Sequence, residues 1–342
     1  MKHKIQAAVI GCGGWGPNLL NVFFSNSECK LRWMCDLSQK RLDFLKETFH
    51  DVQTTTNYMD ILNDPKVDLV AVATPIDSHY PIAKAALEKG KHVLVEKPMT
   101  ASVKEAKELI AIAEQRKLLL AVDHVLVYNN EALYLKNLID SGELGELLYF
   151  DSVRVNLGAV RQDYNVLWDL AVHDISLLYH LVGYLPKAVL AVGTSHVQGQ
   201  PESMAQLHMS FDGNFVAQTY VNWVSPVKMR HGVLVGTKKM VYYNNLNPSE
   251  QLRIYDRGVT SSHVKQESGD AYKFEYRMGD VVSPYIPPID ALRNEIKQII
   301  EAIRTGKKPL ADGHAGLQVV RILEAAQESL DGGSITVKLE DR

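Results

Sequence analysis

Lys97 is the first residue of this sequence whose type and setting suit chemistry at a substrate oxygen. It follows Glu96 at the end of a predicted strand, residues 91–95, and precedes Pro98, which biases it toward an extended conformation and away from a helix. A lysine in a partly desolvated cleft can hydrogen-bond a substrate oxygen and stabilise its developing charge. The alternative, a surface lysine in a loop, stays open on the chemistry alone.

An acid and an imidazole form the second chemical group. Asp169 and His173 are four residues apart in a segment, residues 166–182, that we predict to be a helix, so they share one face. Side by side, they can orient a substrate hydroxyl and remove its proton. A helical salt bridge is the alternative. A metal half-site is disfavoured, because no further cysteine–histidine group has ligand spacing, and we therefore predict no metal.

A glycine-rich turn near the start of the chain predicts a phosphate-binding loop. The apolar run 5–10 reads as a buried strand, Gly11-x-Gly13-x-x-Gly16 follows, and residues 18–25 read as a helix. Gly11 would permit the tight turn, Gly13 a close approach of the backbone to a pyrophosphate, and Gly16 close packing of helix on strand. The N-terminus of the helix adds free N–H groups and a positive dipole end. Strand, turn and helix together predict a dinucleotide site, whereas the glycines alone would be weak evidence.

Asp36 supports the same prediction and points to the cofactor. It ends a second predicted strand, residues 31–36, twenty residues after Gly16. An acid at that place would bind the ribose hydroxyls of the adenosine and repel a 2′-phosphate, so NAD is predicted over NADP. Arg41 lies about one helical turn further on. It could cover the adenine, or it could be a solvated surface arginine.

The composition excludes several classes of protein. The 342 residues are 46% hydrophobic and 23% charged, with a net charge of −3, which is typical of a globular chain with room for two domains. We expect no nucleic-acid partner, since there is no basic stripe, and no membrane partner, since no apolar run approaches a spanning length. We expect no signal peptide, and the three cysteines do not have the spacing of a disulfide framework, so we expect the cytoplasm.

Strands and helices alternate in the first part of the chain, which predicts right-handed crossovers and a parallel sheet. Ligands bind outside the carboxyl ends of the strands in such sheets, and Gly11, Asp36, Pro75, Lys97 and His124 all fall at such ends. The predicted strands are residues 5–10, 31–36, 52–55, 67–74, 91–95 and 118–122. The predicted helices are residues 18–25, 38–49, 57–62, 81–89 and 102–116, the last with Ser102 as its N-cap.

The second part of the chain has a different pattern. Helices at 130–141 and 166–182 surround a strand at 147–156. Short strands then follow at 188–194, 203–211, 215–223, 231–236, 239–243 and 252–255, before terminal helices at 289–305 and 314–330. This predicts an α+β domain with a large, mostly antiparallel sheet. We place a Rossmann domain at 1–123 and a substrate-binding and oligomerisation domain at 124–342, with the last helices free to pack back on the first. One sheet face needs covering, so we expect a homodimer or homotetramer.

The combination of motifs resembles the Gfo/Idh/MocA family, the glucose–fructose oxidoreductase and inositol dehydrogenase group, over nearly the whole chain. The motifs are the glycine fingerprint, Ala73-Thr74-Pro75 with His79, Glu96-Lys97-Pro98, Asp169-x-x-x-His173 and the final helix from Ala311 to Ser329. The resemblance implies hydride transfer between a nicotinamide and a carbon that bears a sugar or polyol hydroxyl, the CH–OH dehydrogenases of class EC 1.1.1.

The resemblance also assigns roles to residues. Lys97 would polarise the reacting oxygen, His173 would be the general acid/base and Asp169 would position substrate hydroxyls; whether Lys97 or His173 carries the proton stays open. The implied cofactor-binding set is Gly11, Gly13, Gly14, Trp15, Gly16, Asp36, Arg41, Thr74, Pro75, His79, Glu96, Lys97 and His124. The implied substrate-binding set is Lys97, Tyr128, Arg154, Arg161, Asn165, Asp169 and His173.

The stretch from Arg154 to Ala171 resembles the branch of the family that handles bacterial surface polysaccharides and unusual nucleotide sugars, whose members act at C3 of a nucleotide-linked hexose. Arg154 or Arg161 could meet a diphosphate or a carboxylate, or could form an ordinary ion pair. Asn165-Val166-Leu167-Trp168 departs from the commoner glycine-rich lead into the Asp-x-x-x-His segment, which disfavours free polyols. A dehydrogenase of a free sugar, inositol or diol and a catalytically silent NAD-binding regulator remain as alternatives.

Overall fold

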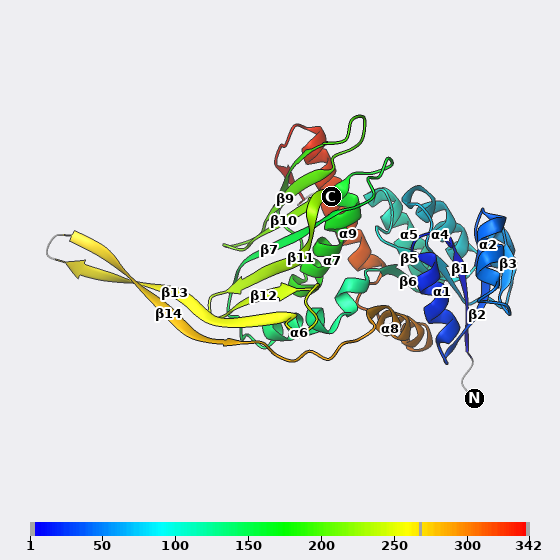
Figure 1. The fold of residues 1–342 in the computed structure, drawn as a ribbon, viewed down its shortest axis with the longest axis horizontal. Coiled ribbons are helices and arrows are strands. Elements are labelled where there is room, and N and C mark those ends of the chain that lie inside the picture. Colours follow the sequence, from blue (N-terminus) through cyan, green and yellow to red (C-terminus); the bar gives the residue numbers. More distant parts are fainter. Residues whose placement is uncertain (1–3, 267–268, 340–342) are drawn as a thin grey trace. The chain divides into compact units, whose positions relative to one another are not determined.

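The computed structural model describes residues 4–266 and 269–339, which form two compact units (Figure 1). The first unit runs to Asn129 and adds Ile289–Glu324. The second unit contains Asn130–Pro288 and the chain from Ala325 onward. The segment Ile289–Glu324 thus packs with the first unit although some 160 residues separate it from Asn129 in the sequence.

A six-stranded parallel sheet forms the centre of the first unit, in the order β3-β2-β1-β4-β5-β6. This is the strand order of the doubly wound dinucleotide-binding fold, so the predicted Rossmann-type sheet is confirmed. The strands are β1 (Ile5–Ile10), β2 (Cys29–Cys35), β3 (Gln53–Thr55), β4 (Leu69–Val72), β5 (His92–Glu96) and β6 (Leu120–Asp123).

Helices cover this sheet because its strands are apolar on both faces. Ala7, Ala8 and Val9 of β1 are fully buried, and so is every residue of β4. The helices are α1 (Gly16–Ser25), α2 (Gln39–Lys46), α3 (Tyr58–Asn63), α4 (His79–Glu88), α5 (Val103–Arg116) and α8 (Ala291–Thr305), with short turns η1 (Ile76–Ser78) and η2 (Val125–Tyr128). The hydroxyl of Ser102 accepts a hydrogen bond from the Glu105 N–H, which confirms the predicted cap of α5.

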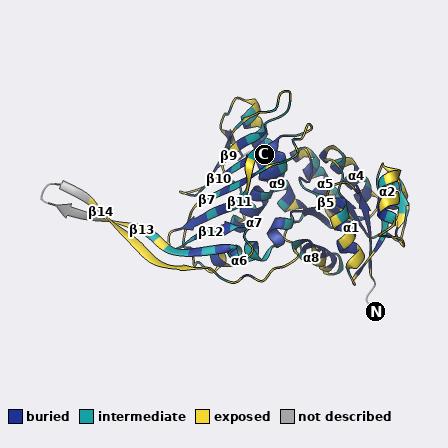
Figure 2. Cartoon of the chain, in the orientation of Figure 1, coloured by how far each residue is buried: buried dark blue, intermediate teal, exposed yellow. Residues whose placement is uncertain are grey.

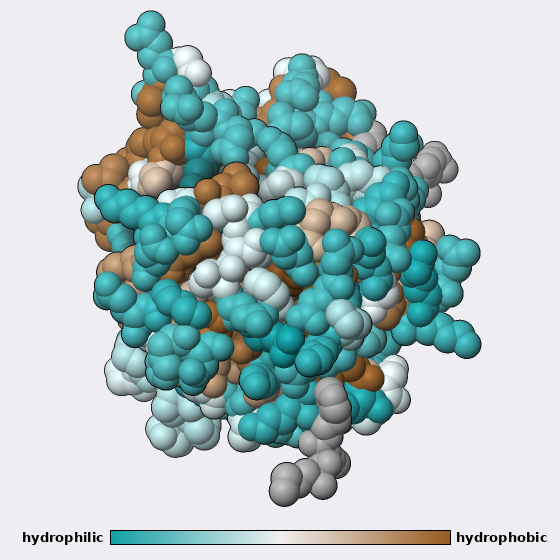
Figure 3. Space-filling view, turned by 90° about the vertical axis from the view of Figure 1, so that its right-hand side faces the viewer, coloured by the Kyte–Doolittle hydropathy of each residue, from teal (hydrophilic) through white to brown (hydrophobic). Residues whose placement is uncertain are grey.

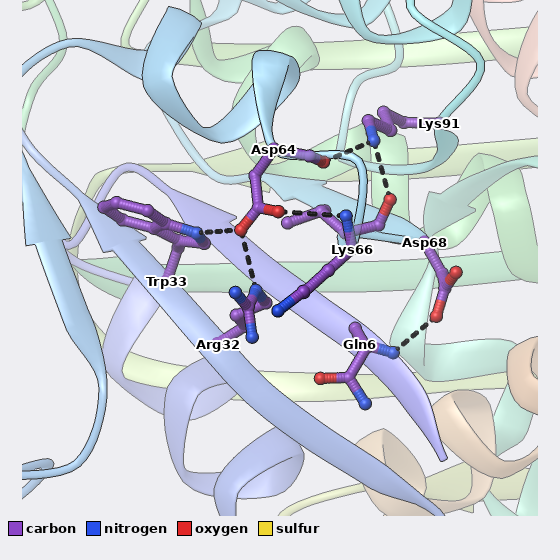
Figure 4. A network of polar contacts seen from close by, with 8 residues as sticks. Gln6, Arg32, Trp33, Asp64, Lys66, Asp68 and Lys91 are labelled. Carbon is purple, nitrogen blue, oxygen red and sulfur yellow. Dashed lines mark hydrogen bonds and ion pairs between the residues drawn. The ribbon is translucent and has the colours of Figure 1, made fainter. Parts of the chain in front are cut away.

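A network of polar contacts fixes the amino-terminal edge of the parallel sheet (Figure 4). The Asp64 carboxylate accepts hydrogen bonds from Arg32 Nε at 2.7 Å, from Trp33 Nε1 at 2.8 Å and from the Lys66 N–H at 2.9 Å. Lys91, just before β5, donates to the carbonyls of Asp64 and Val67. Although burial favours the neutral acid, the hydrogen bonds from Trp33 and Arg32 lower the pKa of Asp64 to about 2.

The second unit is built on a nine-stranded sheet in the order β14-β13-β12-β11-β7-β10-β9-β8-β15. Only β7 and β10 pair in parallel, so the predicted, mostly antiparallel sheet is confirmed. Its strands are β7 (Leu147–Leu157), β8 (Ala188–Thr194), β9 (Met204–Ser210), β10 (Val216–Asn222), β11 (Val224–Gly236), β12 (Met240–Asn244), β13 (Leu252–Gln266), β14 (Gly269–Val282) and β15 (Val337–Lys338). Its helices are α6 (Asn130–Asp140), α7 (Val172–Val182) and the end of α9 (Gly313–Asp331).

The hairpin of β13 and β14 is much longer than the strand predicted at 252–255, and β14 is absent from that prediction. β13 pairs with β12 only as far as Tyr255, and beyond it pairs with β14 alone. Figure 2 shows most of its described length as exposed. Phe274, Tyr276 and Met278 alternate with charged residues along β14, which is a strand pattern. It is weak in the sequence because the polar stretch of β13 offers no matching apolar period.

The sequence predicts one regular helix for the segment that carries Asp169 and His173. The structure differs from this prediction. The segment begins with a π-helical turn, η3 (Leu167–Ala171), and continues as α7. The Val172 N–H donates to the carbonyl of Leu167, five residues back. The extra residue in this turn changes the direction in which Asp169 points relative to His173. π-Turns inside helices are frequent at functional sites.

Figure 3 shows a face of the molecule that is mostly hydrophilic, with hydrophobic residues in small groups. Such scattering is usual for a globular surface. No helix in the described part of the chain has the length and apolar character of a membrane span.

Candidate functional site

The glycine turn has the geometry that a pyrophosphate-binding loop requires. Gly11 has a φ of +94°, and a side chain there would lie 2.4 Å from the Ala73 carbonyl oxygen. A side chain on Gly16 would lie 2.1 Å from the Gly11 oxygen, whereas Gly13 and Gly14 have open space beside them. Two glycines are thus required by packing, and the other two leave the backbone accessible to a ligand. The turn opens α1, which starts at Gly16.

Asp36 and Arg41 both contact this loop. Asp36 Oδ2 accepts from the Cys12 N–H at 2.9 Å, and Arg41 Nε donates to the Cys12 carbonyl at 2.8 Å. The half-buried carboxylate of Asp36 therefore stands at the end of β2 beside the glycine loop, where a ribose-binding acid is needed. Burial raises the pKa of the Cys12 thiol to about 12, which makes this buried cysteine unreactive.

His79 links the ends of two neighbouring strands. One ring nitrogen lies 2.8 Å from the Thr74 carbonyl oxygen, after β4, and the other 2.9 Å from the Pro98 carbonyl oxygen, after β5. The ring is buried, and burial lowers the pKa of His79. Pro75 separates Thr74 from η1, where Ser78 donates to the Thr74 hydroxyl at 2.8 Å. His79 thus positions the loops at the carboxyl edge of the sheet.

Glu96, Lys97 and Pro98 follow β5 at this edge. The Lys97 N–H donates to Glu96 Oε2 at 2.8 Å, and the peptide bond between Lys97 and Pro98 is cis. Both Glu96 and Lys97 are half-buried. Their side chains are therefore neither in the core nor fully solvated, which is the setting that the sequence analysis anticipated for an electrostatically active lysine.

Asp123 and Glu295 are acidic residues of this edge that the sequence analysis missed. Asp123 ends β6 and accepts a hydrogen bond from Trp15 Nε1, in the glycine loop, at 2.6 Å. Its other oxygen, Oδ1, is buried without a hydrogen-bond partner among the described residues, and so are both carboxyl oxygens of Glu295. The sequence contained a signal for Asp123, because this acid lies at the end of a predicted parallel strand, just as Lys97 does. Glu295 had a signal too, as an acid among Leu292, Ile296 and Ile299 on the apolar face of α8.

His124 and Tyr128 are core residues in this structure. Tyr128 is fully buried, its hydroxyl accepts from the Ala311 N–H at 3.2 Å, and its carbonyl accepts from Asn294 Nδ2. His124 is 2% exposed, and burial lowers its pKa to about 3, so its ring is neutral. His124 immediately precedes η2 and Tyr128 ends it, and both side chains are buried, so the expected cofactor and substrate contacts stay predictions.

The second unit positions Asp169 and His173 on neighbouring turns. Asp169 Oδ2 accepts from Trp223 Nε1 at 2.9 Å, and both Asp169 and His173 are half-buried. Asp174 is buried and accepts from Arg154 Nε at 2.7 Å and from Arg154 Nη2 at 3.0 Å. This two-point ion pair fixes the start of α7 against β7, and hence the backbone at His173. Sequence reasoning offered no signal for Trp223.

Arg154 and Asn165 therefore have structural partners where substrate contacts were expected. Arg154 is 5% exposed, and a diphosphate would have to displace Asp174. Asn165 is buried, donates to Glu202 and Gln327, and accepts from the Leu167 N–H at the start of η3. Arg161 remains exposed, with its guanidinium 6.0 Å from the centre of the Tyr164 ring.

Comparison with known proteins agrees with these features. Residues 5–124 match the model of the oxidoreductase family with an NAD-binding Rossmann fold, GFO_IDH_MocA, and residues 132–242 match the GFO/IDH/MocA C-terminal domain. The chain belongs to this family and is an NAD(P)-binding oxidoreductase that acts on CH–OH groups.

Two relatives show the range within the family. The chain is 28% identical to the scyllo-inositol 2-dehydrogenase (NADP(+)) IolW of Bacillus subtilis, with 96% of this chain and 95% of the relative covered. It is 29% identical to the UDP-N-acetylglucosamine 3-dehydrogenase of Acidithiobacillus ferrooxidans over 75% and 76% of the two chains. A solved structure of that enzyme, GnnA, superposes with a TM-score of 0.77 at 26% identity, covering 96% and 97% of the chains.

Proposed function

We propose that this protein is an NAD-dependent dehydrogenase or ketoreductase of a nucleotide-linked hexose, acting at C3 in the synthesis of surface polysaccharides or unusual sugars. The substrate class is proposed from the likeness to the UDP-N-acetylglucosamine 3-dehydrogenase, which is similar to this chain in both sequence and solved structure. The placement of Asp36 beside the glycine loop supports NAD over NADP. The NADP(+) dependence of IolW makes the cofactor preference a matter for measurement.

When bound, the nicotinamide supplies the hydride acceptor or donor. In our proposal, Lys97 donates a hydrogen bond to the reacting oxygen and stabilises the charge that develops there. Asp169, oriented by Trp223, accepts hydrogen bonds from neighbouring sugar hydroxyls. His173 takes the hydroxyl proton in the direction of oxidation and returns it in the direction of reduction. Glu96, Thr74, Pro75 and His79 shape the cofactor side of the site.

Absorbance of NADH tests this proposal directly. Purified protein is given NAD and a panel of UDP-, GDP- and dTDP-hexoses beside free sugars and inositols. A rise with one nucleotide sugar supports the proposal and names the nucleotide. A rise only with a free sugar or inositol contradicts it in favour of the alternative that the likeness to IolW supports.

If no substrate gives a rise, the reverse reaction is measured, because oxidation of a sugar carbon is often uphill. Consumption of NADH with a keto sugar then supports a ketoreductase. Tight binding of NAD without turnover in either direction would favour a regulatory protein that keeps the fold but has no chemistry.

We also propose that the chain forms a homodimer or homotetramer. Phe274, Tyr276 and Met278 of β14 are 61%, 73% and 72% exposed in the single chain, and an isolated two-stranded hairpin is only marginally stable in water. A second copy that covered them would stabilise the hairpin. Light scattering should give twice or four times the mass of the chain, and the double variant Phe274→Ser with Tyr276→Ser should lower it. A monomeric wild-type protein would contradict this proposal.

We also propose that the protein works in the cytoplasm. Its three cysteines are buried and have free thiols, which suits a reducing compartment.

A further inference from the structure

The side of the second sheet that faces α7 becomes more polar toward the end of β7. Side chains alternate between the two faces of a strand, so Arg154 and Asn156 of β7 share a face with Phe150. Arg154 identifies this face as the one toward α7, because it pairs with Asp174 of that helix. Phe150 is fully buried, Arg154 is 5% exposed and Asn156 is half-buried. The face thus changes from core to partly solvated along the strand.

Arg230 of β11 lies directly opposite Arg154 in the antiparallel pairing of β11 with β7. Directly opposite residues share a face, so the Arg230 side chain also extends on the side of α7. Like charges at such a pair are destabilising unless a counter-charge offsets them. Asp174 supplies one, and its two oxygens accept from Nε and Nη2 of Arg154 at 2.7 and 3.0 Å. Two guanidinium groups thus share one carboxylate.

The guanidinium of Arg230 lacks a counter-charge of its own. Among the described residues, Asp174 forms its ion pair with Arg154, and the Nε atom of Arg230 is buried without a hydrogen-bond partner. Burial and the charge of Arg154 lower the pKa of Arg230, yet a guanidinium stays charged in a protein. A half-buried charge without a partner costs free energy of folding. An anion bound at Arg230 would offset that cost.

A hydroxyl group in the same region also lacks a partner. Tyr243 of β12 pairs with Gly232, two residues from Arg230 on the same face of β11. A side chain on Gly232 would lie 2.5 Å from the Tyr243 hydroxyl, so the glycine leaves the space that this hydroxyl occupies. The hydroxyl oxygen is buried without a hydrogen-bond partner among the residues that the structure describes. Arg154, Arg230 and Tyr243 thus offer more donors than Asp174 can accept.

Arg230 lies on the same side of the sheet as the residues that we assign to the substrate. Trp223 directly follows β10 and donates to Asp169 of η3. Asp174 comes directly after His173 in α7. All of these residues belong to the second unit. A ligand that contacts Asp169 and His173 would therefore lie on the face of the sheet that carries Arg230.

The part of β11 before Arg230 is irregular. The pairing with β7 passes from Val224 opposite Leu157 to Met229 opposite Val155, so extra residues of β11 bulge from the ladder. Bulges are frequent next to active sites, where they redirect a side chain or end a pairing. This bulge ends directly before Arg230, which is consistent with a place for Arg230 in a binding site.

We propose that Arg230 binds an anionic group of the substrate, a phosphate or a carboxylate, beside Asp169 and His173. The fork of a guanidinium matches the oxygens of either group with two parallel hydrogen bonds. The bound anion would supply the counter-charge that Arg230 lacks and would leave the pair of Arg154 and Asp174 intact. This inference rests on the proposed function and deepens it, because a nucleotide-linked hexose carries a diphosphate and a sugar acid carries a carboxylate.

Calorimetry with charged and neutral sugars tests the proposal without turnover. The probes are UDP-, GDP- and dTDP-glucose, UDP-glucuronate, glucuronate and glucose, each titrated into protein loaded with NADH. The set separates a diphosphate from a carboxylate and includes a neutral sugar. The wild-type protein should bind at least one anionic probe more tightly than it binds glucose. Inorganic phosphate should weaken that binding by competition.

Matched arginine variants identify the group that binds. Arg230→Gln keeps a polar side chain but loses the charge, so the affinity for the anionic probe should fall by about 10- to 100-fold. Arg230→Lys keeps the charge but loses the planar fork, so the affinity should fall by a smaller factor. Arg253→Gln is the control, because Arg253 is a half-buried arginine of the same sheet that already pairs with Glu250. It should bind the probes as the wild-type protein does.

Thermal melting separates a binding role from a structural one. Arg230→Gln removes a charge that lacks a partner, so the free variant should unfold at the wild-type temperature or above it. The anionic probe should raise the Tm of the wild-type protein more than that of the variant. A free Arg230→Gln protein that melts well below the wild-type protein would show that Arg230 serves the fold, and would overturn the proposal.

The outcomes separate this inference from the broader function. A loss confined to the nucleotide sugars identifies the anion as the diphosphate, and a loss confined to the glucuronates identifies it as the carboxylate. Equal affinities of the wild-type protein and Arg230→Gln for every anionic probe would overturn the inference and leave the nucleotide-sugar chemistry untouched. Binding of glucuronate that depends on Arg230, without binding of a nucleotide sugar, would support the inference and contradict the nucleotide-linked hexose. A wild-type protein that binds no anionic probe would contradict both.

Discussion

At the amino-terminal edge of the parallel sheet, the Asp64 carboxylate accepts three hydrogen bonds, from Arg32, Trp33 and Lys66. At the opposite edge, Asp123 accepts one hydrogen bond, from the indole of Trp15, and its second oxygen is buried without a partner among the described residues. The pKa of Asp64 falls to about 2, whereas burial raises the pKa of Asp123. One edge holds a carboxylate with three donors, and the other holds a buried carboxyl group with a single donor among the described residues.

Asp64 and Asp123 differ in the number of their hydrogen-bond donors, and this number distinguishes a structural acid from a candidate functional one. Both groups lie on the same sheet and both include a tryptophan–aspartate hydrogen bond, so residue type does not separate them. The number of donors does, because a carboxylate with enough donors stays ionised over the whole physiological range, whereas a buried acid without them remains titratable.

The two lysines that flank β5 should give the largest contrast. Lys97→Met should lower kcat by at least about 10²-fold, because it removes the charge at the reacting oxygen, while NAD binding persists. Lys91→Met, at the other end of the strand, should leave kcat within about twofold. It should cost about 1–3 kcal/mol of the free energy of unfolding, because two buried carbonyls lose their donor.

Steady-state kinetics and urea denaturation measure the two effects on both variants. Normal turnover by Lys97→Met would show that the role assigned to Lys97 is wrong. A loss of turnover in a folded Lys91→Met protein would contradict the purely structural role that we assign to the amino-terminal edge of the sheet.

Asp36 should control the choice of cofactor. The wild-type protein should bind NAD more tightly than NADP, and Asp36→Ala should weaken NAD binding by about 10- to 100-fold, because hydrogen bonds to a charged group are lost. Affinity for NADP should fall less, since the repulsion of its 2′-phosphate is removed with the carboxylate. Fluorescence titration with both cofactors provides the measurement. Equal affinities of the wild-type protein for NAD and NADP would contradict this assignment.

The two tryptophan–aspartate pairs offer a smaller and more specific contrast. Trp15→Phe removes the only N–H donor found for Asp123 in the described residues and should weaken NAD binding by up to about tenfold. Trp33→Phe leaves Asp64 with Arg32 and Lys66, so it should affect unfolding and leave NAD binding unchanged. Cofactor titration and thermal melting of both variants decide the matter. Equal effects on NAD affinity would count against a special role for the carboxyl edge.

The pH dependence of stability should report Asp64. Its pKa is lowered from 3.8 to about 2, so the folded state favours the ionised acid and the contribution to stability is complete above about pH 4. As the pH falls from about 4 to about 2, the acid takes up a proton and that contribution is lost. Asp64→Asn should already lack it at neutral pH, at a cost of about 1–3 kcal/mol, and should show a shallower acid limb. Parallel acid limbs for the two proteins would show that another group is responsible.

Local patterns in the sequence were sufficient for much of the first unit. Continuous apolar runs identified the parallel strands, because both faces of such strands are buried, and Gly11 and Gly16 were readable because only glycine fits where backbones approach so closely. The position of Asp36, Lys97 and His124 at one edge of the sheet could be predicted, because all three follow the carboxyl ends of parallel strands. The second unit was less readable. Its sheet was predicted, but β14 was not, since hairpin strands with polar stretches carry little periodicity.

What the sequence determined by itself was therefore the order of the elements and the residues placed at their ends. What only the tertiary structure decided was the state of those residues. Arg154 became half of a buried ion pair with Asp174, and Tyr128 and His124 turned into the core. Glu295 became fully buried, with no hydrogen-bond partner for its carboxyl oxygens among the described residues. The pKa of a carboxyl group depends on its burial and on the donors around it, and both are set by neighbours that are distant in the chain.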